Sequence, residues 1–222
     1  MQKIEFFENQ RAAGYDQFVE TWIPNYHYFM DIVPSLLQDT VNKNLLVVGC
    51  GTGAEIKRFV QASETWKITG IDPSPEMIEQ AKENLTEAQS VDLIEGVISD
   101  IDVSKQFGAA TLLLVLHFMA DDGTKLALLK DIAIRLEKDA SFVLLDITGS
   151  NDQLKANLNI LKLLLPAGLK EEDIDHRMAR IEHNLHSVSE ERLRELLIEA
   201  GFATPLRFFQ NSIYMGWMTK KV

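Results

Sequence analysis

The hydrophobic pattern of the chain alternates between two periodicities. Short apolar runs typical of buried strands occur at 44–49, 66–72, 91–96, 110–118 and 141–148. Apolar residues recur at helical spacing between several of these runs, at 77–88, 126–136 and 193–200. Strands that alternate with helices predict an α/β fold, a mostly parallel sheet with helices on both faces.

The ends of the predicted helices carry recognisable signals. The Ser-Pro-Glu sequence at 74–76 is typical of a cap, a first-turn proline and a first-turn acid. Asp121 or Asp122 is expected to cap the helix over 126–136, and Gly201 is expected to end the last helix. These signals place the helices between the strands.

The tail of the chain departs from this alternation. The runs PLRFFQ (205–210) and SIYMGWM (212–218) are separated only by a tight turn at Asn211-Ser212. So short a connection predicts that the last two strands are antiparallel.

Two segments lie outside the strand–helix rhythm. Residues 1–40 are helical in pattern and rich in aromatic side chains, which are Phe6, Phe7, Tyr15, Phe18, Trp22, Tyr26, Tyr28 and Phe29. Residues 151–186 carry an apolar stripe, made of Leu154, Leu158, Leu161 and Leu165, that Pro166 and Gly168 interrupt. We expect a single domain over 1–222, with 1–40 as a helical cap and 151–186 as a lid over the carboxyl edge of the sheet, where ligands bind in such folds.

Composition and charge narrow the class of protein. The net charge is −11, from 33 acidic and 22 basic residues, and no basic cluster is visible, so direct nucleic-acid binding is not expected. No apolar run approaches the length of a membrane span, and the start of the chain lacks the apolar core of a signal peptide. The single cysteine, Cys50, excludes an intrachain disulfide and suits a reducing compartment. We therefore expect a cytoplasmic protein, for which a homodimer is one arrangement that the sequence allows.

The strongest local motif is a glycine-rich loop between a buried strand and a helix. It reads Gly49-Cys50-Gly51-Thr52-Gly53, and glycine there permits a tight turn and close approach of the backbone to a ligand. The second strand ends at Asp72, where a carboxylate can accept hydrogen bonds from both hydroxyls of an adenosine ribose. Loop and acid together predict a site for an adenosine-containing cofactor.

The loop alone leaves several ligands open. With Ala54 it also satisfies the nicotinamide dinucleotide fingerprint, and a glycine-rich turn without any ligand is a further alternative. A nicotinamide enzyme usually adds a substrate domain, for which 222 residues leave little room, and the antiparallel tail argues against a repeated nucleotide half-fold. We therefore favour S-adenosyl-L-methionine.

The motifs together resemble the class I S-adenosylmethionine-dependent methyltransferases. The resemblance rests on GCGTG, IDPSPEMIEQAKENL, LHF and EAGF, and it covers about residues 40–219. It implies a Rossmann-like fold with a seven-stranded sheet whose last strand is antiparallel. Met77, on the helix that follows Asp72, is a further candidate for the cofactor site.

A narrower resemblance covers nearly the whole chain. The stretches IPNYHYFMDIV, VDLIEGVISDI and IEHNLHSVSEERLRELLIEAGFATPLRFFQNSIYMGWM are similar to the carboxy-S-adenosylmethionine synthase family of tRNA wobble-uridine modification. That family converts S-adenosylmethionine, with prephenate, into a carboxylated sulfonium. The resemblance implies cofactor contacts at Tyr26, Gly49, Cys50, Gly51, Asp72 and Pro73.

Several positions depart from that family. An acid that contacts the adenine is replaced by Val97, although backbone groups of Val97 and Ile98 can still bind the adenine edge. A strand-four asparagine is replaced by Leu113, which we retain as a cofactor contact, and the arginine for the added carboxylate is replaced by Met178. Arg177 and Arg180 flank that position. These differences favour plain S-adenosylmethionine.

Histidines are the remaining candidates for chemistry. His117 ends the fourth strand and is the candidate catalytic residue, as a general base or substrate contact, with simple packing as the alternative. Three further histidines lack a carboxylate or cysteine at ligand spacing, so no metal site is expected; they are His176, His183 and His186.

The sequence thus predicts a methyltransferase that uses S-adenosylmethionine on an unidentified, small-molecule acceptor. Two alternatives stay open: an enzyme like the carboxylating synthase, and a protein that binds the cofactor without turnover.

Overall fold

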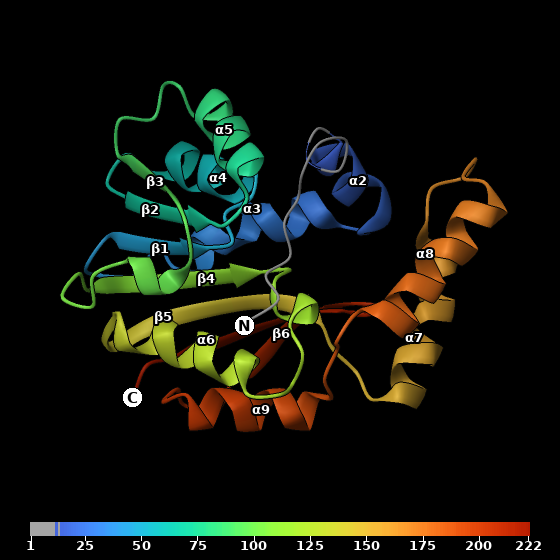
Figure 1. The fold of residues 1–222 in the computed structure, drawn as a ribbon. Helices are drawn as coiled ribbons and strands as arrows, with labels where there is room; N and C mark the ends of the chain where they lie inside the picture. The colour runs from blue at the N-terminus through green and yellow to red at the C-terminus, as the bar shows by residue number, and fades with distance from the viewer. Residues whose placement is uncertain (1–11, 13) are drawn as a thin grey trace.

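A computed structural model describes residue 12 and residues 14–222. Seven strands form one sheet in the order β3-β2-β1-β4-β5-β7-β6 (Figure 1). The strands are β1 (Asn44–Val48), β2 (Lys67–Asp72), β3 (Val91–Glu95), β4 (Phe107–Leu113), β5 (Leu136–Ile147), β6 (Leu206–Asn211) and β7 (Tyr214–Lys220). Strands β1 to β5 pair in parallel, and β7 runs antiparallel to both β5 and β6. This confirms the predicted Rossmann-like sheet with its antiparallel last strand.

Helices cover both faces of the sheet (Figure 1). They are α2 (Tyr15–Trp22), α3 (Tyr26–Leu36), α4 (Ala54–Ala62), α5 (Pro75–Asn84), α6 (Thr124–Ile134), α7 (Asn151–Leu164), α8 (Glu171–Asn184) and α9 (Glu190–Glu199), with short 3₁₀ turns η1 (Ile98–Asp100) and η2 (Leu116–Phe118). One apolar core contains residues of α3, α4 and α5, and a second contains residues of α6 and α9. The helices of these two layers bury the two faces of the sheet.

The fourth strand is shorter than its apolar run predicts. The strand expected over 110–118 ends at Leu113, and Leu114 takes a left-handed backbone conformation with φ of 62°. The Asp146 carboxylate on β5 accepts the N–H groups of Leu116 and His117, so the chain leaves the ladder and forms η2. This turn carries His117 out of the strand and to the edge of the sheet.

Local boundary signals are partly confirmed. Ser74 precedes α5 and Gly201, with φ of 95°, follows α9 as predicted. The N-cap of α6 is Gly123 and not the predicted Asp121 or Asp122. Asp122 lies one residue earlier and accepts the N–H of Thr124, the first residue of the helix. The hairpin between β6 and β7 turns at residues 212–213, one position later than predicted, since Asn211 still pairs with the first residue of β7.

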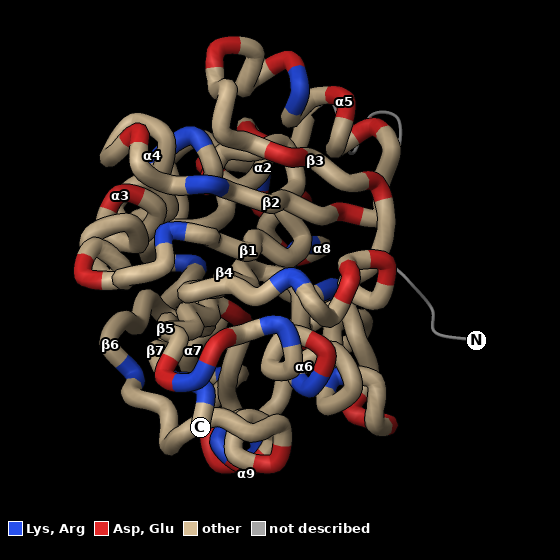
Figure 2. Tube along the Cα trace, turned by 90° about the vertical axis from the view of Figure 1, so that its left-hand side faces the viewer, with Lys and Arg blue, Asp and Glu red and all other residues tan. Residues whose placement is uncertain are grey.

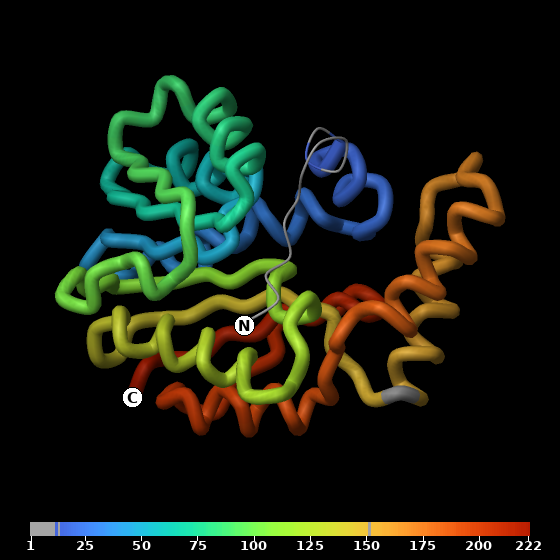
Figure 3. Tube along the Cα trace, in the orientation of Figure 1, coloured from blue at the N-terminus to red at the C-terminus, as the bar shows by residue number. Residues whose placement is uncertain are grey.

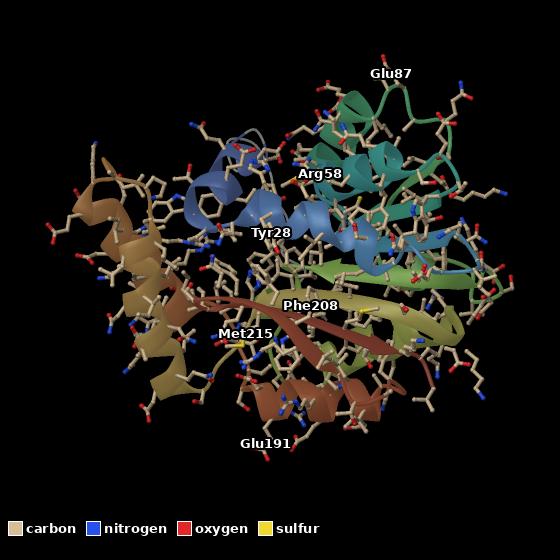
Figure 4. The ribbon with its side chains drawn as sticks, turned by 180° about the vertical axis from the view of Figure 1, so that it is seen from behind. Tyr28, Arg58, Glu87, Glu191, Phe208 and Met215 are labelled. Carbon is tan, nitrogen blue, oxygen red and sulfur yellow. The ribbon has the colours of Figure 1, made fainter. Side chains whose placement is uncertain are left out.

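The predicted N-terminal cap divides into two different elements. Helix α2 lies at the carboxyl edge, whereas α3 packs along a face of the sheet beside the β6–β7 hairpin (Figure 4). The Phe29 ring lies 6.0 Å from the ring of Phe208 and 5.0 Å from that of Phe209, centre to centre. The expectation of a cap over all of 1–40 is therefore wrong for α3, whose apolar stripe is a core face. Phe6 and Phe7 lie outside the described residues.

Helices α7 and α8 form a hairpin that stands beyond the carboxyl ends of the strands (Figure 3). Leu154, Leu158 and Leu161 of α7 are buried, as the apolar stripe predicts, and Met178 and Ile181 of α8 are buried too. This hairpin lies within the segment expected to be a lid, and its role and movement as a lid stay predictions.

Charged side chains are mixed over the molecule. Lys and Arg are interspersed with Asp and Glu along the chain trace (Figure 2). Among the described helices, none has the length and apolarity needed to cross a lipid bilayer.

Candidate active site

The glycine loop connects β1 to α4 and closes tightly against its neighbours. Gly49 and Gly53 have φ of 70° and 79°, in the left-handed region that favours glycine. A Cβ on Gly49 would lie 2.5 Å from Cγ2 of Val115, and one on Gly53 would lie 2.8 Å from Cδ1 of Leu85. The loop therefore needs glycine for both conformation and space, as its sequence predicts.

Asp72 joins the end of β2 to this loop. Its Oδ2 accepts the N–H of Gly51 at 3.0 Å, and its Oδ1 accepts the N–H of Ser74 at 2.9 Å. Burial raises the pKa of the Asp72 carboxyl, and hydrogen bonding from the two backbone N–H groups and from the Ser74 side chain opposes the rise. The buried carboxylate thus fixes the loop from the end of β2.

A cavity of about 180 Å³ opens over the loop and Asp72. Most of the predicted cofactor residues line it, namely Gly49, Gly51, Asp72, Pro73, Met77, Val97, Ile98 and Leu113. We call this the cofactor cavity. Its lining also includes Tyr15, Ser99 and Phe118, which the sequence did not single out as cofactor contacts.

Four predicted cofactor residues are not in that lining. Cys50 is buried and packs beneath the loop, where burial raises the pKa of its thiol, so it is a packing residue and a poor nucleophile. Thr52 donates its hydroxyl hydrogen to Asp16 Oδ1 at 2.6 Å, and Gly53 is the N-cap of α4. Tyr26 lines a separate small cavity with Arg58. Direct contact of these four residues with a cofactor stays a prediction.

A second cavity, of about 210 Å³, adjoins the first. The two share Tyr15, Leu114 and Phe118 in their linings. The remaining lining of the second cavity is Gly14, Phe18, Val19, Ile23, His117, Ile147, Arg177, Arg180 and Tyr214. We call this the acceptor cavity, and it joins elements α2, η2, α8 and β7, which are distant in the sequence.

His117 lies in the acceptor cavity on a fixed support. Its Nδ1 is 2.9 Å from Oδ1 of Asp146, and both side chains are buried. Because the carboxylate accepts a hydrogen from Nδ1, the neutral ring carries its lone pair on Nε2. A histidine oriented in this way can accept a proton. The sequence did not point to Asp146, which lies inside the apolar run at 141–148.

Lys125 holds the turn that carries His117. It is 1% exposed and donates to the backbone oxygens of Leu116, at 2.5 Å, and of His186, at 2.8 Å. The N–H of His186 in turn donates to the backbone oxygen of His117 at 2.7 Å. The chain leaving α8 is therefore tied to η2.

The three other candidate histidines lie outside both cavities. His176, His183 and His186 surround a more open, polar depression that shares only Phe118 and Arg180 with the acceptor cavity. Within residue 12 and residues 14–222, no three His, Cys, Asp or Glu side chains are grouped so as to hold a metal ion.

Comparison with known proteins identifies the class of domain. Residues 45–139 match a family described as "Methyltransferase domain". A carboxy-S-adenosyl-L-methionine synthase of Shewanella piezotolerans is 26% identical over 215 residues, which are 92% of this chain and 87% of that protein.

Solved structures agree on the fold. A putative O-methyltransferase from Nostoc punctiforme matches with a TM-score of 0.71 and 16% identity. The match covers 96% of this chain and 61% of that protein. Magnesium protoporphyrin IX methyltransferase from Synechocystis, solved with bound S-adenosylhomocysteine, matches with a TM-score of 0.66 and 15% identity over 95% of each chain. Residues 45–139 thus match a methyltransferase domain and the chain has the class I methyltransferase fold, and S-adenosylmethionine is the methyl donor that such a domain implies.

Proposed function

We propose that the protein transfers a methyl group from S-adenosylmethionine to a small molecule held in the acceptor cavity. The observation that carries this proposal is the pair of adjoining cavities. One is lined by the glycine loop and Asp72, the other contains the His117–Asp146 pair, and Tyr15, Leu114 and Phe118 belong to both.

The lining of the cofactor cavity fits an adenosine-containing donor. The carboxylate of Asp72 lines the cavity, where a carboxylate can accept hydrogen bonds from ribose hydroxyls, and the side chains of Met77 and Leu113 offer apolar surface. Gly49 leaves no room for a side chain where the backbone meets the cavity. When bound, S-adenosylmethionine supplies an electrophilic methyl group on a sulfonium centre.

The residues of the acceptor cavity orient the acceptor and accept its proton. Asp146 holds His117 with Nε2 free to remove a proton from an acceptor that must lose one. Phe18, Ile147 and Phe118 make much of the wall apolar, which excludes water from the reacting groups. Most of the rate enhancement in such a site comes from proximity and alignment across the shared wall.

The proposed function is tested by measuring which cofactor binds and which small molecule is methylated. Calorimetry should give micromolar binding of S-adenosylmethionine or S-adenosylhomocysteine and none of nicotinamide dinucleotides, and mass spectrometry of the purified protein should identify the molecule that copurifies. Formation of S-adenosylhomocysteine with a methylated small molecule supports the proposal. Tight dinucleotide binding without S-adenosylmethionine binding would overturn it, and cofactor binding without turnover on any acceptor would favour a binding protein.

The single cysteine and the acidic net charge support a cytoplasmic protein with a small acceptor.

A second candidate function is the carboxylating synthase reaction. The synthase relative spans 92% of this chain, and Arg177 and Arg180 both line the acceptor cavity. Against it, Leu113 lines the cofactor cavity where the family resemblance implies asparagine, and Met178 is buried in the apolar core. We expect plain S-adenosylmethionine to bind better than its carboxylated form and prephenate not to be consumed. Competition between the two sulfonium compounds, followed by mass spectrometry, decides between the two reactions.

A further inference from the structure

Arg177 of α8 is a cation in the wall of the acceptor cavity. It is partly buried, and its guanidinium carbon lies 4.7 Å from the centre of the Phe18 ring. No carboxylate in the described part of the chain forms an ion pair with it, and its Nε is buried without a hydrogen-bond acceptor. A chain with 33 acidic residues could easily pair this arginine, and an unsatisfied charged donor costs free energy.

Tyr214 of β7 contributes a second unsatisfied donor to the same cavity. Its side chain is 1% exposed, and its hydroxyl donates no hydrogen bond to any residue that the structure describes. Burial raises the pKa of this phenol, and the charge of Arg177 together with its hydrogen-bonding interaction with the phenol oxygen opposes the rise, so the hydroxyl keeps its proton. The cavity therefore contains a buried O–H donor close to a guanidinium.

The other residues of the lining set the character of the ligand. Phe18, Val19, Ile23 and Ile147 are apolar, and no acidic side chain belongs to the described lining. Arg180 adds a second guanidinium where the cavity meets the polar depression. Few polar groups converging in an apolar pocket are typical of a small-molecule site, and an arginine with a neutral donor is well suited to a carboxylate.

We propose that the acceptor of the methyl group is a small carboxylate with an apolar body, whose anionic end is bound by Arg177 and the hydroxyl of Tyr214. This inference rests on the proposed methyl transfer, because it names the substrate class of that site. His117 lies in the same cavity, so the anionic end and the proton-accepting nitrogen belong to one ligand site.

The cofactor is an alternative source of the anion. A methionine carboxylate, or the added carboxylate of a carboxylated sulfonium, would present the same chemistry to Arg177. Arg177 and Tyr214 belong to the lining of the acceptor cavity and are absent from that of the cofactor cavity, which favours the acceptor.

The experiment uses benzoate and its neutral analogue benzamide as probes. Each is titrated by calorimetry into the full-length protein, with and without saturating S-adenosylhomocysteine. We expect saturable benzoate binding and at least about tenfold weaker binding of benzamide, as the loss of a charge-assisted hydrogen bond predicts. Arg177→Gln should weaken benzoate binding by about tenfold or more, and Tyr214→Phe by several-fold, while the affinity for S-adenosylhomocysteine stays unchanged.

Arg194→Gln is the matched control. Arg194 also stacks on an aromatic ring, with its guanidinium carbon 5.3 Å from the Trp217 ring centre, but it lies on α9 and outside the acceptor cavity. It should leave the binding of both probes unchanged. Tyr214→Phe keeps the buried ring and removes only the hydroxyl, so weaker benzoate binding with an unchanged melting temperature cannot be attributed to misfolding.

Three results would overturn the proposal. The first is equal affinity for benzoate and benzamide, or no saturable binding of benzoate. The second is a loss of S-adenosylhomocysteine affinity in Arg177→Gln with benzoate binding intact, which assigns the arginine to the methionine carboxylate. The third is an Arg177-dependent preference for the carboxylated sulfonium. Failure of S-adenosylhomocysteine to bind at all would instead overturn the proposed function, and the benzoate–benzamide comparison without cofactor would still decide the anion site.

Discussion

Asp146 binds both the ring and the backbone of His117. Its Oδ1 lies 2.9 Å from Nδ1 of the ring and accepts the backbone N–H of the same residue at 3.1 Å. The carboxylate also accepts the N–H groups of Leu116 and Ile147. The position of the ring and the path of the chain after β4 therefore both depend on this carboxylate, and Lys125 binds the same turn.

His117→Ala should lower turnover by about 10²–10⁴-fold if the ring is a general base, with little change in affinity for S-adenosylhomocysteine. The physical reason is that His117 lines the acceptor cavity and not the cofactor cavity. Steady-state kinetics and calorimetry measure the two effects, and His183→Ala, an exposed histidine outside both cavities, is the control. A variant with normal turnover and only a lower melting temperature would assign His117 to packing.

Asp72→Ala should weaken cofactor binding by roughly 10²–10⁴-fold, because two charge-assisted hydrogen bonds to a ribose are lost at about 1.5–3 kcal/mol each. The variant also frees the N–H of Gly51, so melting curves should accompany the calorimetry. Asp102→Ala, at an exposed acid that only accepts the N–H of Ser104, is the control. Equal losses in the two variants would show that Asp72 does not bind the cofactor.

Glu55→Gln should stabilise the protein in a pH-dependent way. Burial raises the pKa of Glu55 from 4.5 to about 7, and its Oε1 has no hydrogen-bond partner in the part of the chain described. The folded state binds this proton more tightly than the unfolded state, so the stability that it contributes is present below pH 4.5 and lost as the pH rises through 7. The glutamine mimics the protonated acid, and its gain in free energy of unfolding should be about 2–3 kcal/mol larger at pH 8 than at pH 5.

Denaturant unfolding at these two pH values measures the difference, with exposed Glu79→Gln on α5 as the control. A constant gain at both pH values would show that Glu55 titrates normally in the folded state.

Bound S-adenosylhomocysteine should slow amide hydrogen exchange in residues 151–186. The hairpin α7–α8 stands beyond the strands and contributes Arg177 and Arg180 to the acceptor cavity, so closure of the site should protect it. Exchange in α9 is the internal control, because α9 packs in the second apolar core whereas α7 and α8 pack in the first. Unchanged protection throughout 151–186 would make the hairpin a static part of the fold.

The sheet and its glycine loop were readable from the sequence because local signals agree with the global fold. The apolar runs, the glycines at 49 and 53 and the acid at the end of β2 each have one local cause, such as a positive φ or a buried strand. The same local signals gave the wrong expectation for the position of α3. An aromatic amphipathic helix has the same pattern whether it covers a ligand or a sheet face, and its contacts with Phe208 and Phe209 come from the far end of the chain.

The acceptor cavity could not be derived in this way. Asp146 lies within an apolar run that reads as a buried strand. Its role depends on the end of β4 at Leu113, and the sequence between 110 and 118 gives no signal for that end. Tyr214 reads as a strand residue of the tail hairpin, and Arg177 as one charge among many on a polar helix. Only the fold brings these side chains to one wall.

The wall shared by the two cavities also has a consequence for ligand design. Tyr15, Leu114 and Phe118 border both sites, so one molecule with an adenosine end and a carboxylate end could occupy both when joined by a short linker. Such a bisubstrate inhibitor gains from effective concentration, since binding of one end turns binding of the other into an intramolecular step. The linker length that gives the tightest binding would measure the distance between the two bound ends, and so the path of the methyl group.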